Sequence, residues 1–327
     1  LPTGESFFNV EILKKRLSKF NSLNPRKLVK KIDKCQVSSI FHNKEMLGSA
    51  LQHYEKRSEQ IAMARSVTDA VNEGHRLVVE AGTGVGKSLA YMMPAVMYAM
   101  LNNKRVVVST NTINLQEQLL IKDVPALVKV LSHIDSVEID DFRFTQLKGR
   151  SNYLCLRRWS QMRASENISI DESRLLSKLL VWLGSTITGD RGELNLGRRV
   201  QRGNWDQISA QGETNCFGID GICFLRSARE RAAGSHLVIV NHALLMSDLM
   251  AGGTLIPDYD VLIVDEAQHL EDVATRHLGF DLSQRSIEEY FQSIAGDRGL
   301  LGTIVYAFNR SSVAETRKVT VREIVDR

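Results

Sequence analysis

Four short apolar runs along the chain predict strands that are buried on both faces. A half-exposed strand alternates apolar and polar side chains, whereas a strand inside a parallel sheet is apolar throughout. The four runs contain no polar residue and occupy residues 77–79, 106–108, 237–240 and 261–264. Helical patterns lie among them, for example at residues 114–120. Strands that alternate with helices predict an α/β fold with a parallel sheet.

The spacing of these runs predicts an insertion. About 150 residues separate the second run from the fourth, far more than one crossover connection needs. Ahead of the first run, residues 1–50 are rich in lysine, with apolar residues at helical spacing, and carry no pattern that indicates a function. The sequence contains no internal repeat and no low-complexity tract.

A glycine-rich loop follows the first apolar run and predicts a nucleoside triphosphate site. The loop reads Ala-Gly-Thr-Gly-Val-Gly-Lys-Ser, with Ala81 where the strict pattern has glycine. Glycines let backbone N–H groups approach phosphate oxygens, Lys87 adds a positive charge, and Ser88 offers its hydroxyl to Mg²⁺. A chance glycine turn before a helix is the alternative. The predicted nucleotide-binding residues of the loop are Ala81, Gly82, Thr83, Gly84, Val85, Gly86, Lys87 and Ser88.

Two carboxylates directly after the fourth run predict hydrolysis of the nucleotide. Asp265 can bind the Mg²⁺ that bridges the phosphates, and Glu266 can polarise the attacking water. An acidic helix start after a strand is common by itself. Together with the loop, the pair indicates an ATP hydrolase in which Lys87, Asp265 and Glu266 are catalytic and Ser88 and Asp265 bind Mg²⁺.

The charge distribution favours a polyanionic partner. The formal net charge is +4, but residues 1–60 carry twelve Lys and Arg against six acids and residues 148–202 carry eleven against five, whereas residues 236–327 carry eight against fourteen. Aromatic residues are interleaved with the cations of residues 142–159, which suits stacking on bases as well as burial in a core. Solvated helix faces are the alternative explanation of the basic zones.

Nothing in the sequence predicts a membrane or export segment. No run approaches the roughly twenty apolar residues that span a bilayer, and no charged-then-apolar signal opens the chain. We expect a cytoplasmic protein without a membrane partner.

Several segments, in this order, resemble the DinG/XPD type of superfamily 2 DNA helicase, the iron-sulfur group. Residues 54–60 (Tyr-Glu-Lys-Arg-Ser-Glu-Gln) resemble the segment ahead of that family's phosphate loop. The other similar segments are 109–112 and 115–118 (motif Ia), 148–155 (opening the cluster domain), and 224–229 and 240–245 (closing it). The resemblance covers residues 54 to 270.

This resemblance implies roles for residues outside the phosphate loop. Arg57 and Gln60 would contact the adenine, and Gln268 and His269 would couple the nucleotide site to the DNA-binding face. A polar strand end is otherwise a helix cap. The DNA contacts that the resemblance and the hydroxyl, amide and basic side chains imply are Ser109, Thr110, Thr112, Gln116, Lys148, Arg150 and Tyr153.

The cysteines fit the family's [4Fe-4S] cluster incompletely. The family uses four thiolates in the inserted region, but only Cys155, Cys216 and Cys223 lie there, and Cys35 lies outside the matching stretch. Asp220 is a candidate fourth ligand. Loss of the cluster, residues missing between 216 and 223, and cysteines that serve as small buried hydrophobes are the open alternatives.

The resemblance also implies a domain division. A RecA-like ATP-binding lobe takes residues 51–140 and 235–272, an inserted, mostly helical iron-sulfur-type domain takes 141–234, and residues 273–327 begin an Arch-like helical domain after the lead of residues 1–50. Family members need a second RecA-like lobe, which supplies an arginine to ATP in the cleft between the lobes. These residues hold one lobe, so we expect a fragment of a longer helicase or a stand-alone degenerate homologue.

The expected function is therefore that of the N-terminal motor lobe of an ATP-dependent DNA helicase. If it follows its family, it moves 5′ to 3′ on single-stranded DNA and unwinds forked duplex DNA in repair or replication. A nucleic-acid-binding module with little turnover is the alternative, and a small-molecule kinase is a weaker third reading because a kinase needs neither motif Ia nor the Asp-Glu-Ala-Gln-His segment.

Overall fold

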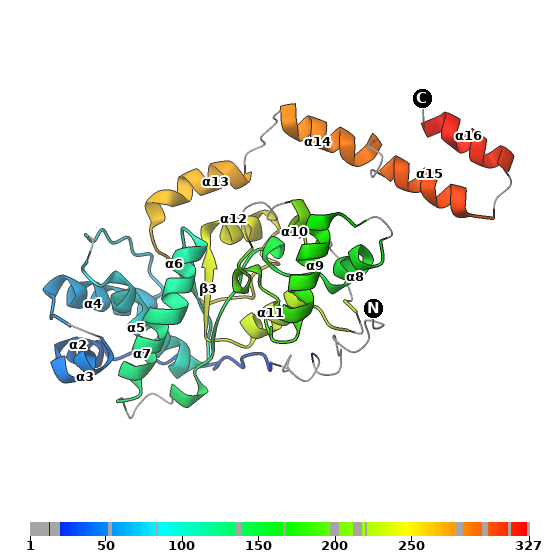
Figure 1. Ribbon diagram of the computed structural model, residues 1–327. Helices are drawn as coiled ribbons and strands as arrows, with labels where there is room; N and C mark the ends of the chain where they lie inside the picture. The colour runs from blue at the N-terminus through cyan, green and yellow to red at the C-terminus, as the bar shows by residue number, and fades with distance from the viewer. Residues whose placement is uncertain are drawn as a thin grey trace. The chain divides into compact units, whose positions relative to one another are not determined.

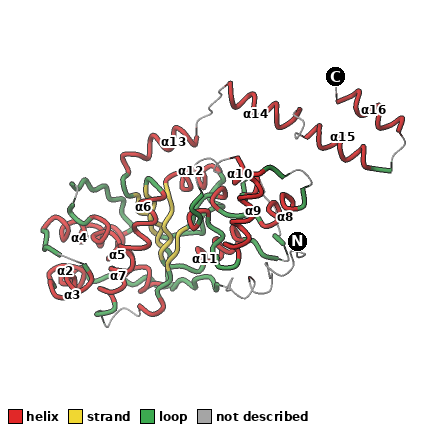
Figure 2. Tube along the Cα trace, viewed as in Figure 1, coloured by secondary structure: helices red, strands yellow, loops and turns green. Residues whose placement is uncertain are grey.

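The computed structural model describes residues 13, 20–51, 54–82, 84–134, 139–165, 168–196, 203–211, 218–219, 221–278, 284–295, 300–312 and 315–325. The chain divides into two compact units, residues Leu1–Ala274 and Thr275–Arg327. The first unit contains a sheet with helices on both faces (Figures 1 and 2). The second consists, in its described part, of helices alone.

A parallel sheet organises the first unit. Its strands are β1 Val106–Thr110, β2 Phe144–Gln146, β3 Leu237–Asn241 and β4 Val261–Val264, in the order β2-β3-β1-β4. All three neighbouring pairs are parallel, and Val106 is level with both Leu237 and Val261. The predicted α/β class and parallel sheet are confirmed. Three of the four predicted strands are present, and β2 is an addition.

The predicted strand at residues 77–79 is not formed as a paired strand. Leu77, Val78 and Val79 are extended but exposed, by 41%, 97% and 38%. Among the described residues, β4 is hydrogen-bonded to β1 alone, and its Leu262 is 39% exposed. An apolar run adopts a strand only where a neighbour offers its backbone hydrogen bonds, and the described sheet offers none here.

Successive residues of the central strands pack into two different cores. Val106 and Val108 contact the first core, whereas Val107 contacts the second. The same alternation continues along β3, because successive side chains of a strand point to opposite faces. The sheet is therefore a middle layer, which explains why these strands are apolar at every position.

The first core is covered mainly by helices that flank the glycine-rich loop. They are α2 Lys34–His42, α3 Lys44–Ala50, α4 Ser58–Glu73, α5 Lys87–Asn102, the π-helical turn η1 Leu119–Asp123 and α7 Val124–Leu131. The helix α6 Ile113–Gln118 leads from β1 into η1. Most of α5 is buried, which matches its run of Ala, Met, Val and Tyr, and it packs along α4. Asn43 caps α3 by accepting a hydrogen bond from the backbone N–H of Met46 at 3.0 Å.

An extended strap, residues 20–33, leads into α2 and is held by two asparagine side chains. The Asn102 carboxamide accepts from the Lys30 backbone N–H at 2.7 Å and donates to the Lys30 carbonyl at 3.0 Å. Asn72 clamps Ile32 in the same way, at 2.7 and 2.9 Å. Each amide thus imitates a strand neighbour for the strap. The described part of the lead segment is therefore attached to the first core.

The inserted segment covers the other face of the sheet and builds the second core. Its elements are η3 Arg150–Asn152, α8 Leu156–Arg163, α9 Ile170–Leu183, η4 Arg191–Glu193, α10 Gly203–Ile208 and α11 Phe224–Ala233. The short turn η2 Ile139–Asp141, ahead of β2, packs against the first core instead. A capping box starts α9, in which Ser169 and Glu172 bond each other's backbone N–H groups at 3.2 and 2.8 Å. Trp159, Trp205 and Phe224 are fully buried beside these helices.

The remaining elements follow β3 and β4. They are α12 His242–Met250, η5 Ala267–His269 and α13 Leu270–Leu278, and in the second unit α14 Gln284–Ala295, α15 Leu300–Arg310 and α16 Glu315–Val325. In the described second unit α14 contacts α15 and α15 contacts α16. In the part of the chain that the structure describes, every helix is too short or too polar to cross a membrane.

Candidate nucleotide site and cysteine cavity

The glycine-rich loop turns into α5 through two glycines with positive φ. Gly84 and Gly86 both have φ +80°, a backbone conformation that is strained for any residue other than glycine. A Cβ on Gly86 would lie 2.3 Å from Gln60 Nε2, and that nitrogen donates to the Gly86 carbonyl at 3.0 Å. A side chain at position 86 would therefore strain the backbone and displace the Gln60 amide. Thr83 lies outside the described residues.

The structure brings the loop and the carboxylates after β4 close together. Lys87 Nζ lies 3.7 Å from Glu266 Oε1 and 3.4 Å from the carbonyl oxygen of Ala81. Asp265 is anchored by its backbone N–H, which donates to the Ser109 carbonyl at 2.8 Å. The site therefore gathers one ammonium, one hydroxyl from Ser88 and two carboxylates at the carboxyl end of the sheet.

The carboxylates are held by Tyr91, which the sequence did not indicate, and by Gln268, which the resemblance had assigned to this site. Tyr91 donates its hydroxyl to Asp265 Oδ2 at 3.1 Å, and burial raises the pKa of Tyr91 well above its ordinary value, with the Asp265 charge adding to the rise. Glu266 has φ +55°, and its backbone N–H donates to Asp265 Oδ1 at 3.0 Å. Gln268 donates to the Glu266 carboxylate. Tyr91 is one turn after Lys87 on α5, and no motif distinguishes it from a core tyrosine.

The segment ahead of α4 lies beside the loop. Arg57 donates to the Gly84 carbonyl and lies 3.6 Å from Glu55. The Tyr54 hydroxyl donates to Gln60 Oε1 at 3.4 Å. Arg57 and Gln60 are thus next to the nucleotide loop, where the resemblance placed an adenine contact. His269 is exposed in η5.

The polar residues after β1 are largely occupied by local contacts. Ser109 is buried and its Oγ lies 2.7 Å from His242 Nδ1, and burial lowers the pKa of His242. Thr110 donates to the Thr112 carbonyl at 3.1 Å, and the exposed Thr112 caps α6 through Leu115 N–H at 3.2 Å. The buried Gln116 amide donates to the carbonyls of Leu147 and Ile239 at 3.0 and 2.7 Å. Thr112 is the exposed member of this set.

Two further residues implied in DNA contact are buried. Lys148 is 3% exposed and its Nζ lies 2.9 Å from Glu117 Oε1 and 2.7 Å from Asp190 Oδ2. Burial alone would lower the pKa of Lys148, but the hydrogen bonds to Asp190 and Glu117 outweigh it and raise the pKa. Tyr153 accepts a hydrogen bond from the Lys148 backbone N–H at 3.1 Å, and burial raises its pKa to about 12. Lys148 therefore joins α6 to the inserted segment.

Two cysteines of the inserted segment line one cavity. Cys155 is buried and Cys223 is half-buried, and the cavity that both line has a volume of about 190 Å³. Three arginines, Arg150, Arg226 and Arg229, also line it, as does Gly218 with φ +73°. Cations around the sulfurs suit ligands that bind as thiolates. The described residues thus fit a thiolate-bound group with two of its ligands.

The other predicted ligands of a cluster are not placed at this cavity. Cys216 and Asp220 lie outside the described residues. Cys35 is exposed on α2. Within the described part of the chain, His, Cys, Asp and Glu side chains form no group of three that could hold a metal ion.

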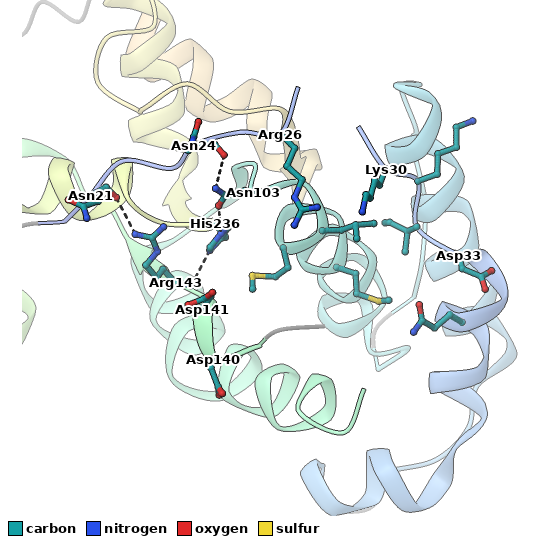
Figure 3. A pocket seen from close by; sticks show the side chains of 16 residues that line it. Asn21, Asn24, Arg26, Lys30, Asp33, Asn103, Asp140, Asp141, Arg143 and His236 are labelled. Carbon is teal, nitrogen blue, oxygen red and sulfur yellow. Dashed lines mark hydrogen bonds between the residues drawn. The ribbon is translucent and has the colours of Figure 1, made fainter. Parts of the chain in front are cut away.

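A further cavity lies under the strap and is separate from the nucleotide loop. Its volume is about 870 Å³, and Met97 and Met100 line it from the last turns of α5, so it is roughly 15–20 Å along that helix from Ser88 (Figure 3). His236 Nε2 lies 2.9 Å from Asn103 Oδ1, while Nδ1 accepts from the Arg143 backbone N–H at 3.2 Å. Burial, reinforced by the Arg143 charge, lowers the pKa of His236 to about 4.

Comparisons with known proteins agree with this geometry. The DEAD/DEAH box helicase family model matches residues 61–138. The chain is 35% identical over 269 residues to the ATP-dependent DNA helicase YoaA of Haemophilus influenzae. The aligned residues cover 79% of this chain and 40% of that protein. It is 36% identical to the ATP-dependent helicase DinG of Mycobacterium tuberculosis, over 71% of this chain and 37% of that protein. The chain belongs to the DinG-type helicase family.

Another DinG-type relative carries a different name. The 3′-5′ exonuclease DinG of Bacillus subtilis is 33% identical, over 83% of this chain and 29% of that protein. The chain spans about a third of the length of the curated relatives it matches. The predicted DinG-type helicase family is confirmed.

Proposed function

We propose that this chain is the ATP-binding lobe of an ATP-dependent DNA helicase that couples hydrolysis to movement along single-stranded DNA, 5′ to 3′, and unwinds forked duplexes. The observation that carries the proposal is the convergence of Lys87, Ser88, Asp265 and Glu266 at one end of the sheet, with Lys87 3.7 Å from Glu266. Membership of the DinG-type family supports ATP as the nucleotide and DNA as the polymer.

In this proposal each residue of the site has one task. Lys87 neutralises the γ-phosphate, and Glu266, held by Gln268, orients the attacking water. Ser88 and Asp265 are hard oxygen donors, the type that Mg²⁺ prefers, and Mg²⁺ takes only one or two protein ligands beside phosphate and water. They would hold the ion, which supplies charge neutralisation of the phosphates when bound.

The DNA contact is proposed for the two residues of the predicted set whose side chains are not buried, Thr112 and Arg150. Thr112 is exposed at the start of α6, and Arg150 is half-buried at the cysteine cavity. Ser109, Thr110, Gln116, Lys148 and Tyr153 would instead shape this region, because their side chains are buried in the described arrangement.

Replacement of Lys87 tests the hydrolysis. We expect Lys87→Ala to lower ATP turnover at least about 100-fold, measured with and without single-stranded DNA, since the phosphate charge loses its protein partner. The far-ultraviolet circular dichroism and the melting temperature stay as in the parent. Lys318→Ala, in the second unit, is the control. Equal turnover by Lys87→Ala and the parent contradicts the assignment.

A [4Fe-4S] cluster at the cysteine cavity is a further part of the proposal. Cys155 and Cys223 would be ligands, with Cys216 the third thiolate, and the cluster would add covalent cross-links within the inserted segment. Anaerobic purification followed by iron and acid-labile sulfide assays tests this. We expect near four irons per chain, reduced by Cys155→Ser but not by Cys35→Ser. Iron-free protein with a normal melting temperature refutes the cluster.

A further inference from the structure

A buried pair of polar side chains lies at the carboxyl end of the sheet. His242 directly follows β3 as the first residue of α12, and its side chain is fully buried. Its Nδ1 lies 2.7 Å from Oγ of Ser109, which is also fully buried. Val107, two residues before Ser109 and on the same face of β1, belongs to the second core. The pair therefore meets on the side of the sheet that faces the second core, away from water.

The bond between the two side chains indicates which ring nitrogen carries the hydrogen. Burial lowers the pKa of His242, so its ring is neutral near pH 7 and has one N–H donor and one acceptor nitrogen. If Ser109 donates to Nδ1, its hydroxyl is satisfied and Nε2 carries the hydrogen. In the opposite arrangement the serine hydrogen and the Nε2 lone pair would both be buried without a partner among the described residues. We therefore assign the hydrogen to Nε2.

The Nε2–H group of His242 is a buried donor without an acceptor. Among the described residues, no atom meets hydrogen-bond geometry with this nitrogen. Unpaired buried donors are rare in folded proteins, because the lost hydrogen bond to water is not replaced. Such a group is a candidate for a functional contact that forms in another state of the molecule.

The turn after β4 offers the acceptor. Ser109 joins the turn to the histidine, because its backbone carbonyl accepts from the Asp265 N–H at 2.8 Å while its hydroxyl bonds His242. The backbone of Glu266 and Asp265 raises the pKa of His242 against the larger effect of burial, as neighbouring carbonyl oxygens do. The Glu266 carbonyl already accepts from the His269 N–H at 3.0 Å. The Asp265 carbonyl is therefore the candidate acceptor.

We propose that His242 is a positioning residue for the Asp265–Glu266 turn, whose Nε2–H donates to the Asp265 carbonyl when nucleotide and Mg²⁺ are bound. Glu266 has φ +55°, a strained conformation for this residue, so the turn can release strain when it shifts. Through Ser109, His242 also links the turn to the end of β1, close in sequence to the proposed DNA contact Thr112. The inference rests on the proposed function, since it concerns the carboxylates of the same nucleotide site.

Nitrogen-15 NMR of the histidine side chains tests this contact without any need for turnover. We expect the His242 signals, assigned by their loss in His242→Gln, to show the hydrogen on Nε2 in the nucleotide-free protein. Saturation with a non-hydrolysable ATP analogue and Mg²⁺ should move the Nε2–H proton downfield, as a new hydrogen bond does. A hydrogen on Nδ1, or signals that do not change at saturation, overturns the inference. If the parent binds the analogue no better than Lys87→Ala does, the proposed function is overturned instead.

Steady-state ATP hydrolysis gives a second readout. We expect His242→Phe to lower kcat about 3- to 10-fold, the equivalent of one hydrogen bond, with the KM for ATP unchanged because the turn orients water rather than ATP. His242→Gln places an amide N–H near the Nε2 position and should recover most of kcat. His236→Phe makes the same change at a buried histidine just before β3 and should turn over as the parent does.

Two outcomes contradict the positioning role. One is an equal kcat for His242→Phe and the parent, and the other is a His242→Gln variant as slow as His242→Phe. If His242→Phe fails to fold, the NMR measurement on the parent decides the question.

Discussion

Lys148 and Lys87 show which side chains can be assigned a role from local sequence. Lys87 follows the glycines of the loop at the spacing of the nucleotide-binding pattern, so its role can be predicted from neighbouring residues. In the structure its Nζ lies 3.7 Å from Glu266 Oε1. Lys148 stands in an equally basic segment, but its partners Glu117 and Asp190 come from distant parts of the chain. No local pattern contains those partners, so the family resemblance and the basic side chain implied a DNA contact for a residue that the structure places in a buried ionic group.

His236 gives the stability of the first unit a dependence on pH. Its pKa is about 4 in the folded protein and about 6.5 in an unfolded chain, so between these values the unfolded chain binds the additional proton. The free energy of unfolding should therefore fall as pH decreases from 6.5 to 4, by at most about 3 kcal/mol. Above pH 6.5 this contribution is complete and constant.

Urea denaturation at several pH values measures this effect. His236→Gln removes the titrating group, so its stability should change less with pH between 6.5 and 4 than that of the parent. His75→Gln, at an exposed site beside Glu73, is the control and should follow the parent. Parallel curves for the parent and His236→Gln would show that His236 does not titrate as described.

At the scale of elements, the continuous apolar runs correctly predicted a strand wherever a second strand pairs with the run. The runs at residues 106–108, 237–240 and 261–264 became β1, β3 and β4. β2 was missed because Phe144–Gln146 is three residues long and mostly polar, so its strand form comes from pairing with β3. Residues 77–79 carry a strand pattern without a partner. Strand pairing depends on two segments, so the residues of one segment do not show whether a partner lies beside it.

The strap offers a test of how an extended segment is retained. We expect Asn102→Ala to remove the clamp on Lys30 and to lower the free energy of unfolding by about 2 kcal/mol, because the Lys30 N–H and carbonyl lose a buried partner. Trypsin should cut faster after Lys27, Lys30 and Lys31. Asn152→Ala, which loses only a local bond to Gly149, should leave the digestion unchanged. Unaltered cleavage in Asn102→Ala means that other contacts hold the strap.

At the scale of the whole molecule, the first unit places two sites on one sheet. The glycine-rich loop and the first core lie on one side of the alternating strand residues, and the cysteine cavity and second core on the other. A shift of one residue in β1 would exchange the two sets, so register matters to both sites. Strands that are apolar on both faces predicted that the sheet is a middle layer. They did not predict the ion pairs by which Lys148 joins α6 to the inserted segment.

The sheet should be unevenly protected from solvent. We expect the amides of residues 77–79 to exchange with deuterium orders of magnitude faster than those of Val107 and Ser109 in β1, which has a strand on each side. Hydrogen exchange with mass spectrometry resolves these segments. Equal protection would mean that residues 77–79 find a backbone partner in solution.

One edge of β4 is unpaired among the described residues, and this edge affects the association of the protein in solution. An apolar strand with unpaired N–H and C=O groups recruits strands from other molecules, and this recruitment grows with concentration because it is bimolecular. Dilute samples would then stay monodisperse. Concentrated samples would contain oligomers, which either dissociate on dilution or grow into a precipitate. The strand that ends at Asp265 and Glu266 therefore also presents the edge at which we expect such association to begin.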